Sequence, residues 1–146
     1  MHIEPGIVDS AKIVLSYATA AGAGAVTLRE SVNTARATGL APFLGRIAAT
    51  TGLVFTFFEI LPHYPVGVSE VHFILGSTLF LLFGAAPAAL GLALGLLVQG
   101  VFFAPFDLPQ YGMNVTTLLV PLFALQWAAR RLIAPATPYV DLQYRQ

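Results

Sequence analysis

Long apolar runs separated by short polar segments dominate the sequence. The first runs extend from Ala11 to Leu28 and from Leu40 to Leu61, and the last from Met113 to Ala129. Each is long enough to cross, or nearly cross, about 30 Å of hydrocarbon as a helix that rises 1.5 Å per residue. The uncharged stretch from Phe73 to Phe106 would form a helix of about 51 Å, which is too long for one crossing. We therefore expect it to turn back at Gly84-Ala85-Ala86-Pro87 and cross twice.

This pattern predicts an all-α, polytopic transmembrane helical bundle with about five spans. The expected loop from Arg29 to Arg46 and the tail after Arg130 fall on the same side, and together they hold six of the seven basic residues. By the positive-inside rule, that side is cytoplasmic, so the N-terminus is outside and the C-terminus is inside. We expect a transmembrane domain at residues 1–132, a cytoplasmic tail at residues 133–146, and a location in the cytoplasmic (inner) membrane.

Composition agrees with this class and excludes several functions. Hydrophobic residues make up 57% of the chain and charged residues 10%, against about 25% charged in a typical soluble domain. Because cysteine is absent, any metal must be bound through nitrogen or oxygen. The balanced charge argues against nucleic-acid binding. No phosphate loop or hydrolase motif is present, so we expect no enzyme activity, and ATP hydrolysis would come from partner subunits.

The first two residues form a candidate metal-binding group. The amine of Met1, the amide nitrogen of His2 and the imidazole of His2 can form two fused chelate rings on one ion. Nitrogen ligands in this arrangement suit Ni(II), Cu(II) and Co(II) rather than Mg(II) or Ca(II). The three nitrogens leave one corner of a square open, so a fourth ligand is needed.

His72 is the best candidate for this fourth ligand, because it stands at the mouth of a long apolar run on the same expected side. His63 competes for the role, although its prolines and tyrosine are more typical of an interfacial residue. Placing the charged side chain of Glu59 in lipid costs free energy, so we expect it to face the protein interior or a cavity. There it can orient a ligand histidine or extend outward to water.

Four segments together resemble the substrate-capture subunits of cobalt and nickel energy-coupling factor transporters, the CbiM/NikM family. They are the start Met1-His2-Ile3 followed by Gly6, the sequence from His72 to Gly76, the run from Leu96 to Phe103, and the sequence from Gly112 through Asn114 to Pro121. The resemblance covers Met1 to about Arg131.

The resemblance implies a membrane subunit that captures Co(II) or Ni(II) as transported substrate, with no cofactor. The implied metal ligands are Met1, His2 and His72, with Asn114 in a loop near the site. The implied partners are a coupling transmembrane protein, ATPase subunits and a small accessory membrane subunit, within the lipid bilayer.

The sequence departs from the family pattern at three places. An acidic residue, Glu70, lies close to the expected ligand His72, and Thr117 replaces a second asparagine of the Asn114 loop. Family members continue with further spans, so we expect the chain to be a fragment or a subunit truncated at its C-terminus. Glu59, Glu70 and Asn114 are then candidates for a shell of residues around the ligands.

Two other functions stay open at this level. One is a metal-independent helical scaffold or assembly subunit that binds other membrane proteins through its glycine-rich faces. The other is a vitamin-capturing subunit of a related transporter. That function needs an aromatic-lined pocket, whereas the phenylalanines here are more typical of residues that face lipid or neighbouring helices.

Overall fold

The computed structural model describes residues 8–62, 64–66, 69–71 and 73–133. This part of the chain contains five α-helices: α1 (Ser10–Thr38), α2 (Leu40–Phe55), α3 (Gly76–Phe83), α4 (Ala85–Phe102) and α5 (Tyr111–Leu132). It also contains a π-helical turn, η1 (Thr56–Ile60), a 3-10 helix, η2 (Pro105–Gln110), and two short strands, β1 (Tyr64–Val66) and β2 (Ser69–Val71). The strands pair antiparallel, with Tyr64 opposite Val71.

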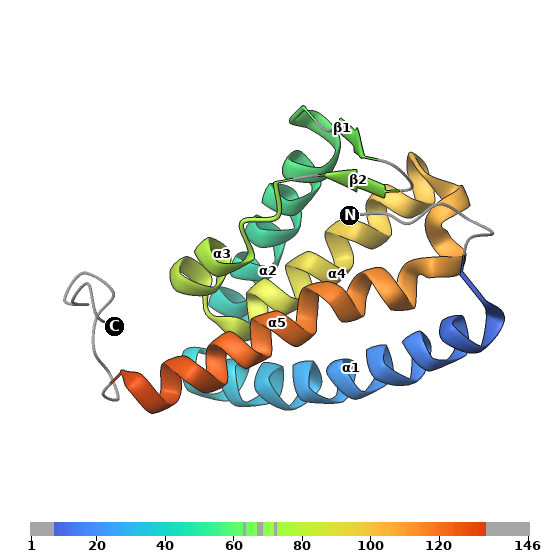
Figure 1. Cartoon of the computed structure of the whole chain (residues 1–146). Coiled ribbons are helices and arrows are strands. Elements are labelled where there is room, and N and C mark those ends of the chain that lie inside the picture. The colour runs from blue at the N-terminus through green and yellow to red at the C-terminus, as the bar shows by residue number, and fades with distance from the viewer. Residues whose placement is uncertain (1–7, 63, 67–68, 72, 134–146) are drawn as a thin grey trace.

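The helices form a bundle around α4 (Figure 1). The described helix α4 packs against α1, α2, α3 and α5, and its alternating small residues and leucines are largely buried. α1 and α5 run side by side in the same direction, with Thr19 opposite Thr116 and Glu30 opposite Gln126 (Figure 1). Four segments are long and apolar enough to cross a membrane: Ser10–Thr38, Leu40–Ile60, Ala85–Phe102 and Pro105–Leu132. The prediction of an all-α polytopic membrane protein is confirmed.

The third of the five predicted crossings differs from a full helical span. α3 has only eight residues, so it rises about 12 Å, less than half of the hydrocarbon thickness. Residues 73–75, which precede α3, are not helical, and Leu75 has a positive φ of 47° where the helix begins. The chain therefore returns between α2 and α4 through a hairpin, an irregular segment and a short helix.

α1 is longer than the apolar pattern predicts. We expected a polar loop from Arg29, but the helix continues through Arg29, Glu30 and Arg36 and ends at Thr38. Gly39, with a φ of 87°, then separates α1 from α2 without a loop. The polar residues near the end of α1 are accommodated in the helix because Glu30 has hydrogen-bonding partners on α5.

Two glycines bring α2 and α4 into close contact. A Cβ atom on Gly91 would lie 2.5 Å from the Thr50 Cβ, and one on Gly95 would lie 2.6 Å from the Val54 Cγ1. This close approach puts the Thr50 hydroxyl 2.8 Å from the backbone carbonyl oxygen of Pro87. Gly91 and Gly95 thus form a small-xxx-small motif at the α2–α4 interface. The predicted turn is also present. It is made by Gly84 with a φ of 90°, and Pro87 is the third residue of α4.

Polar side chains line the contact between α1 and α5. The hydroxyls of Thr19 and Thr116 are 3.0 Å apart, and the Tyr17 hydroxyl donates to the carbonyl oxygen of Leu108 at 3.2 Å. Gly112 lets the helices meet here, because a Cβ on it would lie 3.0 Å from the Tyr17 ring. Hydrogen bonds therefore link α1 to α5 through Thr19 and to η2 through Tyr17.

Candidate functional site

The bundle has two chemically different ends. One, the hairpin end, carries the start of α1, η1, the strands and η2 (Figure 1). The other, the arginine end, carries the last turns of α1, the first turns of α2, the turn between α3 and α4, and the last turns of α5. The arginines of the described segments all lie toward the arginine end: Arg29, Arg36, Arg46, Arg130 and Arg131.

At the hairpin end, Glu59 extends from the π-helical turn that terminates the second span. Its carboxylate accepts a hydrogen bond of 3.3 Å from the Gln99 amide on α4. Gln99 itself is only 4% exposed. Glu59 is half-buried, and this contact directs its carboxylate toward α4. π-helical turns frequently occur at functional sites, because the extra residue redirects the side chains that follow.

A second group of polar residues lies where η2 meets α5. Gln110 and Asn114 are 1% and 4% exposed, and the Tyr111 hydroxyl donates to the carbonyl oxygen of Ala93 at 2.8 Å. Asn114 and Asp107 also line a small cavity of about 10 Å³, whose other walls are formed by α4, Leu108 and Tyr111. That volume is close to what one water molecule needs. The hairpin end thus holds amide and carboxylate groups within an otherwise apolar bundle.

Sequence reasoning identified Glu59 and Asn114 here but missed Gln99 and Gln110. The signal for Gln99 was present, because it is the one strongly polar side chain in the apolar run from Leu96 to Phe103. Gln110 gave no such signal, because it lies in a segment with two prolines, Pro105 and Pro109. The structure shows a 3-10 helix that buries it.

The expected metal ligands Met1, His2 and His72, and the competing residue His63, lie outside the described residues. Glu70 belongs to strand β2, but its side chain is also outside the described part. Among the described residues, no group of three or more histidine, cysteine, aspartate or glutamate side chains could hold a metal ion. The described polar residues of the hairpin end therefore do not form a metal site by themselves.

The arginine end has its own buried charge. Arg130 donates to the Glu30 carboxylate at 2.6 Å, and Gln126 donates to the same oxygen at 2.9 Å. The Glu30 side chain is 12% exposed and the Arg130 side chain 63%. These contacts join α1 to α5 near their ends, so the cluster stabilises the bundle rather than presenting a reactive group.

This fold, with its long apolar helices and a polar group at one end, defines a polytopic helical membrane protein. The chain belongs to the CbiM family, described as the cobalt uptake substrate-specific transmembrane region, whose model matches residues 2–144. The family consists of transporter components that act in cobalt uptake together with other subunits. No curated protein and no solved structure matches the chain.

Proposed function

We propose that this protein captures Co(II) or Ni(II) at its hairpin end and is the substrate-binding component of a larger uptake transporter. The amine of Met1, the amide and ring nitrogens of His2 and the ring of His72 would form a four-nitrogen ligand set. Such a set suits Co(II) and Ni(II) and rejects Mg(II) and Ca(II), which prefer oxygen. The match to the cobalt uptake family over residues 2–144 is the observation that carries the proposal.

The arrangement of the described elements supports the same site. Residue 72 directly follows β2, and residues 1–7 lead to Asp9, which caps the first turn of α1 through a 2.8 Å hydrogen bond to the Ala11 amide. Both attachment points belong to the hairpin end (Figure 1). The N-terminal segment and the histidine loop are therefore tethered to the same end of the bundle, although they are far apart in the sequence.

The polar groups at the hairpin end have a proposed role around the metal. A histidine ligand commonly donates its second ring N–H to a carboxylate or amide oxygen, which fixes the orientation of the ring. Glu59 and Asn114 supply such oxygens at the hairpin end, and Glu70 is two residues before His72 in the sequence. In this proposal Glu59, oriented by Gln99, holds a ligand histidine rather than the metal itself.

The proposal includes the direction of transport and the partners. The arginine end would face the cytoplasm and the hairpin end the outside, so that the ion is captured where it arrives. A coupling transmembrane protein and ATPase subunits would supply the energy, because the described helices contain no nucleotide-binding fold. A small accessory membrane subunit and the lipid bilayer would complete the assembly in the cytoplasmic membrane.

Calorimetry tests this function directly. Co(II) and Ni(II) are titrated into detergent-purified protein that starts with its native Met1, and into a variant with one extra residue in front. We expect tight one-to-one binding by the native chain and loss of that binding in the variant, because the extension converts the Met1 amine, a proposed metal ligand, into a backbone amide. Equal and weak binding by both proteins would contradict the proposal and favour the metal-independent scaffold.

The choice of fourth ligand requires a matched pair of variants. His72→Ala should weaken Co(II) binding by at least about tenfold, whereas His63→Ala should leave it nearly unchanged. The opposite result would assign the fourth corner to His63 and leave the amine-dependent part of the site intact.

A further inference from the structure

Leu75, which ends the irregular segment between β2 and α3, has a backbone conformation that leucine rarely adopts. Its φ and ψ are 47° and 28°, in the left-handed region, and it is the one non-glycine residue of the described chain with a positive φ. A Cβ atom makes this region unfavourable, and a bulky residue there is an outlier. The next residue, Gly76, could adopt this conformation without strain, but it is already the first residue of α3. The strain therefore lies on the residue less suited to it.

Contacts on both sides hold Leu75 in this conformation. Its carbonyl oxygen accepts a 2.9 Å hydrogen bond from the amide of Leu79, whose side chain is only 1% exposed. Ile74, the residue before it, packs against the hydrophobic core of the bundle. The Leu75 side chain is itself 43% exposed, so its own burial does not explain the conformation. The left-handed residue instead connects two anchored neighbours, Ile74 and the first turn of α3.

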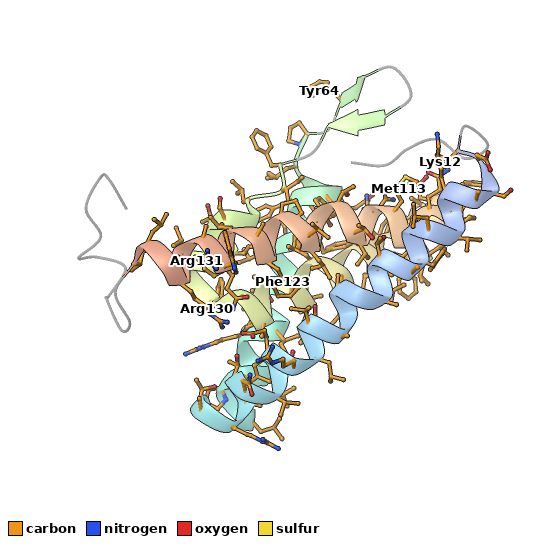
Figure 2. All side chains as sticks on the ribbon, turned by 60° about the horizontal axis from the view of Figure 1, so that its bottom comes forward. Lys12, Tyr64, Met113, Phe123, Arg130 and Arg131 are labelled. Atoms are coloured by element: carbon orange, nitrogen blue, oxygen red, sulfur yellow. The ribbon has the colours of Figure 1, made fainter. Side chains whose placement is uncertain are left out.

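The hairpin on the other side of residue 72 packs less against the bundle. Val71, at the end of β2, pairs with Tyr64 of β1, and among the described elements the two strands contact mainly each other. Tyr64 is 68% exposed, and Figure 2 shows it on the hairpin, outside the group of helices. The described contacts that tie this part of the chain to the bundle therefore lie after residue 72, at Ile74 and Leu75.

We propose that Leu75 is a positioning residue for the metal site. Its left-handed conformation fixes the direction in which the chain enters α3, and so the place of His72, three residues earlier in the sequence. This inference rests on the proposed function, in which His72 is the fourth ligand. Strained backbone is often retained at functional sites, where the surrounding structure holds it. A ligand that is already in place loses less conformational entropy when the ion binds, so the strain raises affinity at the expense of stability.

Two substitutions at Leu75 separate positioning from packing. Glycine accepts the left-handed conformation without strain but also allows many others. Leu75→Gly should therefore leave the unfolding temperature unchanged or raise it, and weaken Co(II) binding in calorimetry about twofold to fivefold. Leu75→Asn should bind Co(II) nearly as well as the native protein, because asparagine tolerates the left-handed region and its Cβ still limits the alternatives.

Leu81→Gly is the matched control. Leu81 belongs to α3 and is 42% exposed, almost the same as Leu75, but its backbone is helical. Glycine is unfavourable in a helix, so this variant should lower the unfolding temperature by about 2–4 °C. Its Co(II) affinity should stay at the native value. The same change of side chain thus has opposite expected effects at the two positions.

A spin label tests the positioning without any metal. The chain has no cysteine, so Phe73→Cys, at a position that is 60% exposed and lies between His72 and Leu75, gives a single labelling site. In the metal-free protein, the label should be more mobile when Leu75→Gly is added. Its mobility should be unchanged by Leu75→Asn or by Leu81→Gly.

The contrary outcomes are distinguishable. If the native protein binds Co(II) and Leu75→Gly binds it equally well, the inference is overturned and the proposed function stands. If Leu75→Gly and Leu81→Gly lower affinity and unfolding temperature alike, Leu75 has only a structural role. If Leu75→Asn loses as much affinity as Leu75→Gly, the leucine side chain matters rather than the backbone conformation. Absence of Co(II) binding by the native protein would contradict the proposed function itself, and this inference with it.

Discussion

Glu30 and Arg130 are 100 positions apart in the chain, yet the guanidinium of Arg130 lies 2.6 Å from the Glu30 carboxylate. Their exposure is unequal, because the Arg130 side chain is 63% exposed and that of Glu30 only 12%. The arginine could be solvated without its partner. The carboxylate is too buried to be solvated well without the arginine. Removal of Arg130 should therefore reduce the stability of the protein more than removal of the Glu30 charge.

We predict that Arg130→Ala destabilises the protein by about 1–3 kcal/mol, because it leaves a largely buried carboxylate with only Gln126 as partner. Glu30→Gln should cost less, since a neutral amide can still bond to Gln126 and the arginine remains solvated. Arg36→Ala, on the exposed face of α1, is the control and should cost little. Thermal unfolding of the three variants in one detergent measures the order. An equal loss for both members of the pair would contradict the argument.

The α2–α4 contact provides a second prediction, based on volume. Gly91→Ala and Gly95→Ala should each destabilise the bundle by about 1–3 kcal/mol or more, because the added methyl would overlap Thr50 or Val54. Gly22→Ala and Gly24→Ala are matched controls on α1, where a Cβ meets nothing within 4 Å. Since alanine favours helix over glycine, the controls should be neutral or slightly stabilising. Melting temperatures that fall equally in all four variants would show that the close approach does not matter.

Metal binding should depend on pH in a defined direction. In the proposed site, protons compete with the ion for the Met1 amine, the His2 amide nitrogen and the two imidazoles. Apparent Co(II) affinity should therefore decrease steadily from pH 8 to pH 6, with proton release on binding. Calorimetry in two buffers of different ionisation enthalpy measures the released protons. Affinity that does not change over this range would indicate carboxylate ligands instead.

Variants of Glu59 and Glu30 should have different effects on Co(II) affinity and on unfolding temperature. Glu59→Gln keeps a side chain that can bond to Gln99 but removes the charge proposed to orient a ligand histidine. We expect Co(II) affinity to fall by about tenfold with little change in unfolding temperature. Glu30→Gln, at the other end of the bundle, should change the unfolding temperature and leave Co(II) affinity unaffected. If Glu59→Gln affected only stability, Glu59 would be a structural residue.

The apolar pattern predicted the class of fold, the positions of four spans and the turn at Gly84. It failed at the end of α1, where Arg29 and Glu30 indicated a loop. Gln126 and Arg130 donate hydrogen bonds to the Glu30 carboxylate. These partners are about a hundred residues away in the sequence, so a local pattern does not reveal them. The pattern also overestimated the third span, because an uncharged run does not distinguish a helix from an irregular segment.

The candidate site was predicted unevenly for a related reason. Glu59 and Asn114 stood out because charge and sequence motif marked them, and the structure finds both inside the hairpin end. Gln99 and Gln110 did not stand out, since a single amide in an apolar or looped segment carries little signal on its own. The assignment of Met1, His2 and His72 remains a prediction, because those residues lie outside the described structure.

The irregular third crossing has a consequence for how the protein is assembled in the membrane. α1, α2 and α4 satisfy their own backbone hydrogen bonds and can each enter lipid as separate helices. Residues 73–75 are not helical, so their backbone groups need partners outside the segment, and the eight residues of α3 are too few to cross the hydrocarbon alone. This segment should therefore reach its final place only after α4 and α5 have been synthesised and have packed around it. His72 directly precedes this segment in the sequence, so in the proposed site metal capture should begin only in a fully assembled bundle.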